Sequence, residues 1–505
     1  MPLVLSRIAR WGGFALLTAF AAGYLFWLPF HPDGAPMTDF SAYYSAGRYW
    51  AHGGDPYSRG IWSVEQTLPG VDPKRAELLP FVGPPLSLPL WAALGKLPYA
   101  LAASLWGVLL LACAAALVMV PAHLAQRRIR RPNAASLLLL VLVAGPLVTA
   151  ISVGQAALPA AAAVDFAILF AAERKWLPMA LAAVLGAMLK PNDALTIAGS
   201  LHEAAALGAA AAAAAISAVA NLPFAGGAHG LIAYLNVLVH QSESERLFVY
   251  QLTTTSIAYG FGLDEHHAQI VGWCVSALAI VATVVAIRWA RLNVVDSGAL
   301  ACAMFPFVMP FEHEPDLAIV FLPALLLLFR AKGWTWGIGA VGTVLICVDA
   351  FAMAQGRLGL VFTVVTVAVA SLQLAALAPP EVRWARLAPF SVIPLVLVAG
   401  LFAPPTRLPM WPAALPQHVA VAANASANAQ WHDEIAAAGL ETQRPWASFL
   451  RLLTLCGCGG IAGGMTALAF SARRAAAAST VPRPEVTDAV PSRAAEQAHA
   501  ELLLT

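Results

Sequence analysis

The amino-acid sequence predicts an all-α polytopic integral membrane protein with about 12–14 transmembrane helices. Hydrophobic residues make up 60% of the 505 residues and charged residues only 11%, whereas a soluble globular chain carries about 25% charged residues. The mean hydropathy of the chain is +0.73. Apolar runs long enough to cross a bilayer also recur along the chain, separated by short polar segments.

The first apolar run covers residues 11–30 and follows Arg7 and Arg10, which is the charge pattern of a signal peptide. The run contains about 20 residues, enough to span the hydrocarbon core. His31 and Pro32 follow it, and they do not offer the small residues that a cleavage site needs. We therefore expect a retained first helix and a cytoplasmic N-terminus.

Basic residues set the orientation of the remaining spans, because Lys and Arg concentrate on the cytoplasmic side of a membrane protein. With the N-terminus inside, the basic clusters all become cytoplasmic if the segment 79–120 crosses only once. The prolines at 80–85 then open a juxtamembrane or re-entrant piece before a helix that begins near Tyr99. The clusters lie at 127–131, 173–176, 288–291, 330–332, 383–386 and 473–474.

The other predicted spans follow from the apolar runs, and they leave both termini cytoplasmic. The segment 193–222 is Ala-rich and is expected to make two short crossings, with small residues that permit close helix packing. The remaining spans are expected near 135–151, 156–172, 176–190, 268–290, 297–311, 315–330, 334–353, 358–377, 387–403 and 446–471.

This topology predicts a transmembrane domain over residues 1–474 and a largely disordered cytoplasmic tail over 475–505. Three long loops, 31–79, 223–267 and 404–445, fall on the outer side. The chain has no Gly-rich phosphate loop of the ATPase type, which argues against an ATP-driven pump, and its net charge of +2 gives no sign of nucleic-acid binding. The six cysteines lie in apolar runs, so neither a disulfide framework nor a metal cluster is indicated.

The first outer loop contains the most informative acid, Asp39, directly before a predicted helix. Tyr43, Gly47 and Trp50 recur at helical spacing on a face that could lie on the bilayer. At this position a carboxylate is either a catalytic group or a helix cap, and capping by Thr38 or Asp39 would stabilise the helix by about 1 kcal/mol. The spacing alone leaves both interpretations open.

A series of short motifs follows Asp39 along the chain, and their order and spacing are more specific than any one of them. The motifs are Asp39 with Tyr43, Tyr44 and Gly47, then 54–57, 81–86, 97–99 with Trp106, Gly154 with Gln155, and 189–191. In this order and spacing the chain resembles glycosyltransferase family 87 over most of residues 37–330. That family comprises polyprenol-phosphate-mannose-dependent mannosyltransferases of the GT-C class, which are multi-spanning helical membrane enzymes.

The resemblance implies that Asp39 is the general base, and a carboxylate shielded at the membrane edge suits that role. The polyprenyl phosphate that leaves is a weak base, so one carboxylate suffices. Lys190 at the outer end of a span matches a Lys-Pro motif of the family, and we assign it to the phosphate of the donor; the alternative is a lysine that snorkels to lipid headgroups. Arg48 and Arg59 are further candidate phosphate ligands, although loop arginines are commonly solvated.

Sugar or acceptor binding is assigned to Tyr43, Tyr44, Gln155 and Glu312. Gln155 has an equally good alternative as a helix-end residue that bonds to backbone.

His313 between two glutamates is a candidate acid, base or hydroxyl donor, with a surface histidine as the alternative. The residues that follow His313 are Glu314 and Pro315, which departs from the His-Tyr of related sequences. A metal ion at this corner is the minor interpretation, because Glu-His-Glu has no dedicated metal spacing, and we expect no metal and no cofactor.

The expected function is transfer of a hexose, with mannose favoured, from a polyprenyl phosphate to a lipid or glycan hydroxyl with inversion. The expected site lies on the outer face of the inner cell membrane, among membrane lipids and without nucleic acid. A secondary transporter or flippase of lipid-linked glycans is the alternative; Asp165 and Asp349 are the acids placed within spans. A scaffold that has lost catalysis is a third possibility. The sequence does not predict the acceptor or the oligomeric state.

Overall fold

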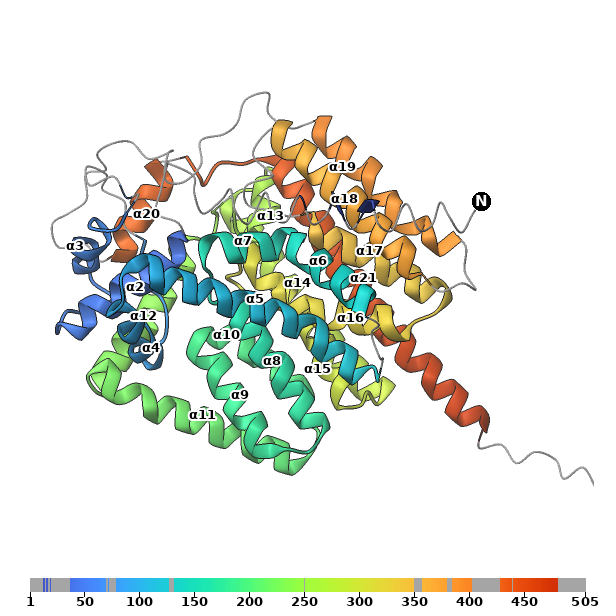
Figure 1. Cartoon of the computed structure of the whole chain (residues 1–505), viewed down its shortest axis with the longest axis horizontal. Coiled ribbons are helices and arrows are strands. Elements are labelled where there is room, and N and C mark those ends of the chain that lie inside the picture. The colour runs from blue at the N-terminus through green and yellow to red at the C-terminus, as the bar shows by residue number, and fades with distance from the viewer. Residues whose placement is uncertain are drawn as a thin grey trace, which may run out of the picture.

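The computed structural model describes residues 12–13, 15–16, 19, 37–69, 71, 79–126, 131–248, 250–348, 357–378, 384–401, 427–437 and 439–479. Every regular element in these residues is a helix (Figure 1), which confirms the predicted all-α class. Most of the expected first span at 11–30 and the tail beyond residue 479 lie outside the described residues, as does Asp349.

Helices long and apolar enough to cross a bilayer occur four times in the described residues, or five times if a bent pair counts as one span. They confirm a polytopic membrane protein, whereas further apolar helices are only 10–17 residues long. Helix length in the described residues therefore does not confirm the predicted 12–14 crossings. The long helices are α5 (Tyr99–Leu124), α11 (Ala204–Ala225), α14 (Glu265–Ala290) and α21 (Pro445–Ser479), and the bent pair is α7 (Gly145–Val153) with α8 (Ala157–Ala172).

The shorter helices fall into two groups, those that continue the apolar body and those that belong to the polar segments. The apolar body includes α6 (Arg131–Val143), α9 (Trp176–Leu189), α15 (Val294–Val308), α16 (Phe321–Arg330), α17 (Gly333–Cys347), α18 (Arg357–Leu377), η7 (Trp384–Arg386), η8 (Ala388–Ser391) and α19 (Val392–Leu401). The others are α2 (Thr38–Ala51), η2 (Arg59–Ile61), α3 (Trp62–Glu65), η3 (Pro85–Ser87), α4 (Leu88–Gly95), α10 (Pro191–Ala194), η4 (Leu195–Ser200), α12 (Ala228–Ser244), α13 (Thr254–Gly260), η5 (Glu314–Val320) and α20 (Ala427–Ala437).

Three predicted spans can be compared directly with these bounds. The segment 79–120 holds one long helix, α5, which begins at Tyr99 as expected. The predicted continuous span 135–151 is wrong: it breaks between α6 and α7, where Pro146 removes a backbone donor and favours a helix start. The predicted pair of Ala-rich crossings at 193–222 is also wrong in form, because only α11 is a long helix and the part before it is the short α10 and η4.

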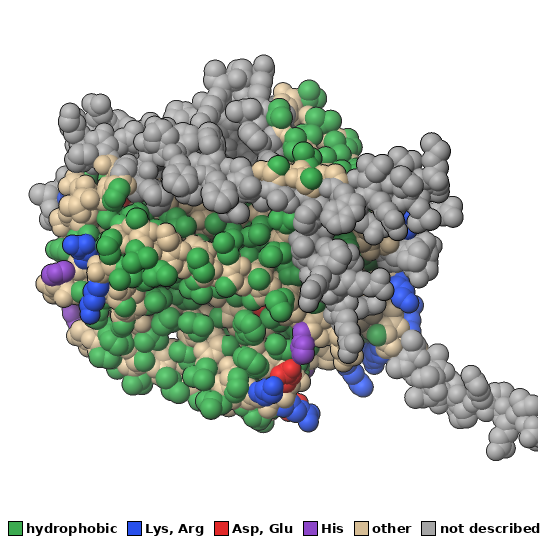
Figure 2. Space-filling view, viewed as in Figure 1, with side chains coloured by type: hydrophobic (Ala, Val, Ile, Leu, Met, Phe, Trp, Pro, Cys, Tyr) green, Lys and Arg blue, Asp and Glu red, His purple; other side chains and the backbone are tan. Residues whose placement is uncertain are grey.

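Some of the charged side chains that the predicted topology assigns to the cytoplasmic side connect neighbouring helix ends. Figure 2 shows a largely hydrophobic face with charged groups at its edges. The contacts that join these groups are largely exposed, so each adds little to stability, but together they show which helix ends are neighbours. They are His123 Nε2 with Glu173 Oε1 (3.2 Å), Arg174 Nη2 with Glu203 Oε1 (2.8 Å), Arg330 Nη2 with the Leu124 carbonyl (3.0 Å) and Arg473 Nη1 with the Trp289 carbonyl (2.8 Å).

The helix α2 rests on α4 with almost no space between the two backbones. A Cβ added at Gly47 would lie 2.2 Å from the backbone carbon of Trp91, so only glycine permits this approach. On the same face the ring of Tyr43 stacks on Trp91 with centroids 4.8 Å apart. The position of α2, and of Asp39 in its first turn, is therefore fixed by packing on α4.

We expect Gly47→Ala to destabilise the protein by about 1–3 kcal/mol, because the added methyl group forces α2 away from α4. The measurement is the melting temperature of the detergent-purified protein. Gly463→Ala in α21 is the matched control, because a Cβ added there meets no atom within 4 Å. A Gly47→Ala protein that melts together with this control would contradict the close approach.

Candidate functional site

The first turn of α2 presents Asp39, which is half-buried. The N-cap of α2 is Met37, with φ at 62°, and no side chain caps the helix. The alternative in which Thr38 or Asp39 serves as the cap is therefore wrong. Burial raises the pKa of Asp39 to about 6, although the positive charges of His313 and Lys190 act in the opposite direction.

Gln155 holds the Asp39 carboxylate from the opposite side of the site. Its Nε2 donates to Asp39 Oδ2 at 2.6 Å, and its Oε1 accepts from the Tyr43 hydroxyl and from the Ala156 backbone N–H at 2.9 Å. The bond to the Ala156 backbone matches the helix-end interpretation of Gln155, and its amide also reaches Asp39, the expected base. Binding of a sugar hydroxyl by Gln155 stays a prediction.

The break between α7 and α8 supplies the geometry for this contact, since the two helices are bent by 119°. Gly154 ends α7 in the left-handed region, with φ at 73°, and a Cβ there would lie 2.6 Å from the Cβ of Phe40. Both the backbone conformation and the close approach to α2 therefore require glycine. Trp106 Nε1 donates to the Gly154 carbonyl at 2.8 Å and satisfies the backbone at this break.

The corner between α15 and η5 brings His313 close to Asp39. A short antiparallel contact with Gln251 fixes the corner: the Leu252 N–H donates to the Glu312 carbonyl at 2.8 Å and the Glu312 N–H to Gln251 Oε1 at 2.9 Å. The His313 N–H donates to Asp316 Oδ2 at 3.0 Å. His313 is thus a partly buried residue, with a side chain 22% exposed, and the surface-histidine alternative is wrong.

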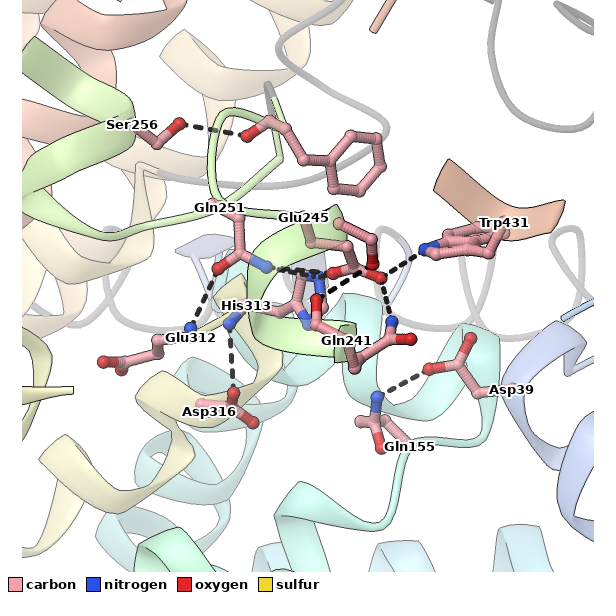
Figure 3. A network of polar contacts seen from close by, with 12 residues as sticks. Asp39, Gln155, Gln241, Glu245, Gln251, Ser256, Glu312, His313, Asp316 and Trp431 are labelled. Atoms are coloured by element: carbon pink, nitrogen blue, oxygen red, sulfur yellow. Dashed lines mark hydrogen bonds and ion pairs between the residues drawn. The ribbon is translucent and has the colours of Figure 1, made fainter. Parts of the chain in front are cut away.

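Neighbouring carboxylates favour the charged form of the His313 imidazole. Its Nε2 lies 2.8 Å from Glu245 Oε2. Burial alone would lower the pKa of His313, but Glu245 and Asp316 outweigh it and raise the pKa above the usual value. Figure 3 shows His313 and Asp39 on facing sides of one polar network.

Lys190 ends α9 in an extended conformation before Pro191, as expected for a residue that precedes proline. Its side chain is 13% exposed and forms an ion pair with Asp316, which is fully buried. Glu312 and Asp193 lie close to this pair, and their carboxylate oxygens have no hydrogen-bond partner among the described residues. Burial raises the pKa of Glu312 well above its usual range.

Two predicted site residues lie apart from this network. Arg48 is exposed in the last turn of α2 and donates from Nη1 to the Tyr44 hydroxyl at 3.2 Å. Tyr44 is buried and donates from its hydroxyl to the Leu97 carbonyl at 2.8 Å. The structure thus brings Asp39, Tyr43, Gln155, Lys190, Glu312 and His313 together and leaves Arg48 and Tyr44 outside.

Sequence reasoning missed Glu245, Gln251 and Arg451. Arg451 lies inside the apolar run of α21, where an arginine asks for a functional or structural reason, and its Nη1 donates to the Gln251 carbonyl at 2.8 Å. That signal was available, whereas nothing local marks Glu245 among the polar residues at the end of α12. The described residues contain no group of three or more His, Cys, Asp or Glu side chains that could hold a metal ion.

The described residues form a helical membrane protein in which a partly buried polar network lies at the ends of several helices. Comparison with protein families adds one match: residues 81–310 are similar to the model of Glycosyltransferase family 87. No curated protein and no solved structure matches the chain. The match is shorter than the expected 37–330 and includes Gln155, Lys190 and Glu245. Asp39 lies well before the matched region, and His313 lies just after it.

Proposed function

We propose that the protein is a membrane glycosyltransferase that moves a hexose from a polyprenyl phosphate to a hydroxyl of a lipid or glycan. The observation that carries the proposal is the meeting of one half-buried carboxylate, Asp39, with the two cationic side chains of Lys190 and His313. The family match over residues 81–310 supports glycosyl transfer. Mannose is the hexose that we propose, and the outer face of the inner membrane is the proposed location, with both termini cytoplasmic.

In the proposed reaction Asp39 takes the proton of the acceptor hydroxyl as the oxygen attacks the anomeric carbon. The bond between that carbon and the phosphate oxygen breaks, and the electron pair leaves with the polyprenyl phosphate. Attack from the face opposite the phosphate inverts the anomeric centre. Gln155 orients the Asp39 carboxylate through its 2.6 Å hydrogen bond, and Tyr43 fixes Gln155 in turn.

The leaving phosphate requires positive charge, which Lys190 and His313 supply in this proposal. Lys190 is paired with Asp316 before the donor binds, so the phosphate competes with a carboxylate for the same ammonium group. Glu312 and Gln155 are the proposed partners of sugar hydroxyls. No metal or cofactor is part of the proposal, and Arg48 remains a candidate for an outer contact with the donor.

Transfer is expected to fall as the pH drops below about 6, because the base form of Asp39 is lost through a pKa of about 6. An unperturbed aspartate would keep its activity to about pH 4. The measurement is the initial rate with saturating donor between pH 4.5 and 8, at roughly half-unit steps. A rate that stays level down to pH 5 would contradict a raised pKa at the catalytic base.

The direct test of the proposed function uses purified protein in lipid vesicles with radiolabelled polyprenyl-phosphate mannose and a total lipid extract as acceptor. We expect label to move into new lipids or glycans, and the same label on a nucleotide to remain unused. Absence of transfer from any polyprenyl-phosphate hexose, with efficient transfer from a nucleotide sugar, would overturn the donor assignment.

One observation favours the second candidate, a transporter or flippase. Asp165 is fully buried in α8, and its two carboxylate oxygens have no partner among the described residues; an intramembrane acid of this kind commonly marks a transport path. Asp165→Asn separates the two candidates. The glycosyltransferase proposal expects chemical transfer to persist in this variant, whereas the transport proposal expects loss of lipid-linked sugar movement across vesicles while Asp39→Asn is tolerated.

A further inference from the structure

The most completely bonded carboxylate near the site belongs to Glu245, which no motif indicated. It directly follows α12 and is 2% exposed. Its Oε2 lies 2.8 Å from His313 Nε2 and accepts from Gln251 Nε2 at 2.9 Å. Its Oε1 accepts from Trp431 Nε1 at 2.5 Å and from the amide of Gln241 (Figure 3).

These donors come from three separate polar segments. Gln241 and Gln251 belong to the segment around α12, His313 to the corner before η5, and Trp431 to α20, which reaches the site from the third predicted outer loop. The rings of Phe248 and Trp431 belong to a small apolar cluster that covers this contact. Glu245 is therefore the point at which the three segments meet.

The hydrogen-bond donors around the Glu245 carboxylate differ in charge, and this difference indicates the role of Glu245. The indole and the two amides are neutral donors whose hydrogen bonds hold the Glu245 carboxylate in place. Within the described part of the chain, the cation in direct contact with Glu245 is His313, which is also edge-on to the rings of Phe248 and Phe311. A buried anion in contact with an imidazole favours the protonated form of the imidazole and fixes the orientation of the ring.

Three other charged groups face His313. Asp316 from η5 accepts a hydrogen bond from the backbone N–H of His313 and favours the charged imidazole. Lys190 at the end of α9 opposes that charge, and Asp39 from α2 faces it across the site. Among these groups only Glu245 touches the ring itself.

We infer that Glu245 is a positioning residue of this site: it orients the His313 imidazole and keeps it charged, while Trp431, Gln241 and Gln251 hold the Glu245 carboxylate. The inference rests on the proposed function, because a charged His313 is required there by the departing phosphate. It also makes α20 a structural part of the site, although α20 lies more than a hundred residues beyond the matched region.

The test compares Glu245→Gln and Glu245→Asp with Glu243→Gln, which changes an exposed glutamate two residues away, in the last turn of α12. The first readout is independent of activity: carbethoxylation of His313 by diethylpyrocarbonate, which attacks the neutral imidazole, followed by peptide mass spectrometry from pH 5 to 9 at roughly half-unit steps. We expect the modification midpoint of His313 to move about 1 pH unit lower in Glu245→Gln, and to stay in place in Glu243→Gln.

The second readout is transfer. In Glu245→Gln the alkaline limit of activity is expected to move in the same direction as the modification midpoint, so that a limit about 1 pH unit lower reduces the rate at high pH about tenfold. Glu245→Asp keeps the charge on a shorter side chain, and we expect it to retain the midpoint but to lose rate at every pH because the imidazole is displaced. Melting temperatures show whether each variant is folded.

The outcomes separate the inference from the function on which it rests. An unchanged His313 midpoint in a folded Glu245→Gln protein would overturn the inference, even if wild-type transfer is efficient. A shifted midpoint in a chain that transfers no sugar would sustain the link between Glu245 and His313 and overturn the proposed function instead. If Glu245→Gln does not fold, Glu245→Asp decides: a midpoint that moves lower while the charge is retained would count against the inference.

Discussion

Asp39→Asn is expected to lower the rate of sugar transfer by about 10²–10⁴-fold, which is the range for loss of a general base. The amide can still accept the hydrogen bond that Gln155 Nε2 now donates to the carboxylate, so the local structure is expected to persist. It cannot take the proton of an acceptor hydroxyl. The initial rate with labelled polyprenyl-phosphate hexose measures the effect.

The matched control for this variant is Asp433→Asn, which removes an exposed carboxylate from α20. Since burial disfavours the ionised form of Asp39, the Asp39→Asn protein is expected to melt no lower than the wild type. Loss of transfer at an unchanged melting temperature would assign Asp39 to chemistry. Full transfer by Asp39→Asn would place the base elsewhere.

Lys190→Met is expected to lower both the stability of the protein and the rate of sugar transfer. Removal of one partner from a buried ion pair costs about 3–5 kcal/mol, because the remaining charge is left uncompensated. Here the carboxylate left behind belongs to Asp316, which is fully buried. The melting temperature and the rate of transfer at saturating donor are the two measurements.

The double variant Lys190→Met with Asp316→Asn distinguishes a structural lysine from a phosphate ligand. The neutral amide has no charge to compensate, so the double variant is expected to recover most of the lost stability. If Lys190 binds the donor phosphate, transfer stays low despite this recovery. Recovery of transfer together with stability would reduce Lys190 to a partner of Asp316 and refute its assignment to the phosphate.

The sequence predicted the general arrangement of the site because several of its parts are local. Asp39 and Tyr43 lie one turn apart on one helix, and Gln155 and Lys190 follow at helix ends, where polar residues are conspicuous in an apolar chain. Glu245 could not be found in this way. Its importance comes from its contacts with His313 and with Trp431, which lies 186 residues away along the chain, and no periodicity encodes contacts of that kind.

The number and continuity of the membrane spans were harder to predict from the sequence, also for a physical reason. Apolar composition shows that a segment is surrounded by lipid or protein, but it does not distinguish a full crossing from a short helix that turns back inside the fold. The break between α6 and α7, and the 119° bend between α7 and α8, occur inside apolar sequence. Pro146 and Gly154 marked these positions, yet each is also compatible with a continuous or gently kinked helix.

The bend at Gly154 limits which substitutions the site can accept during evolution. Gln155 uses one end of its amide to satisfy the Ala156 backbone N–H at the break and the other to orient Asp39. A change at Gln155 that suited a different sugar would therefore also leave a backbone group unpaired within an apolar protein. We therefore expect substrate choice to evolve more freely at exposed positions of the three predicted outer loops, where side chains can be exchanged without opening the helical framework.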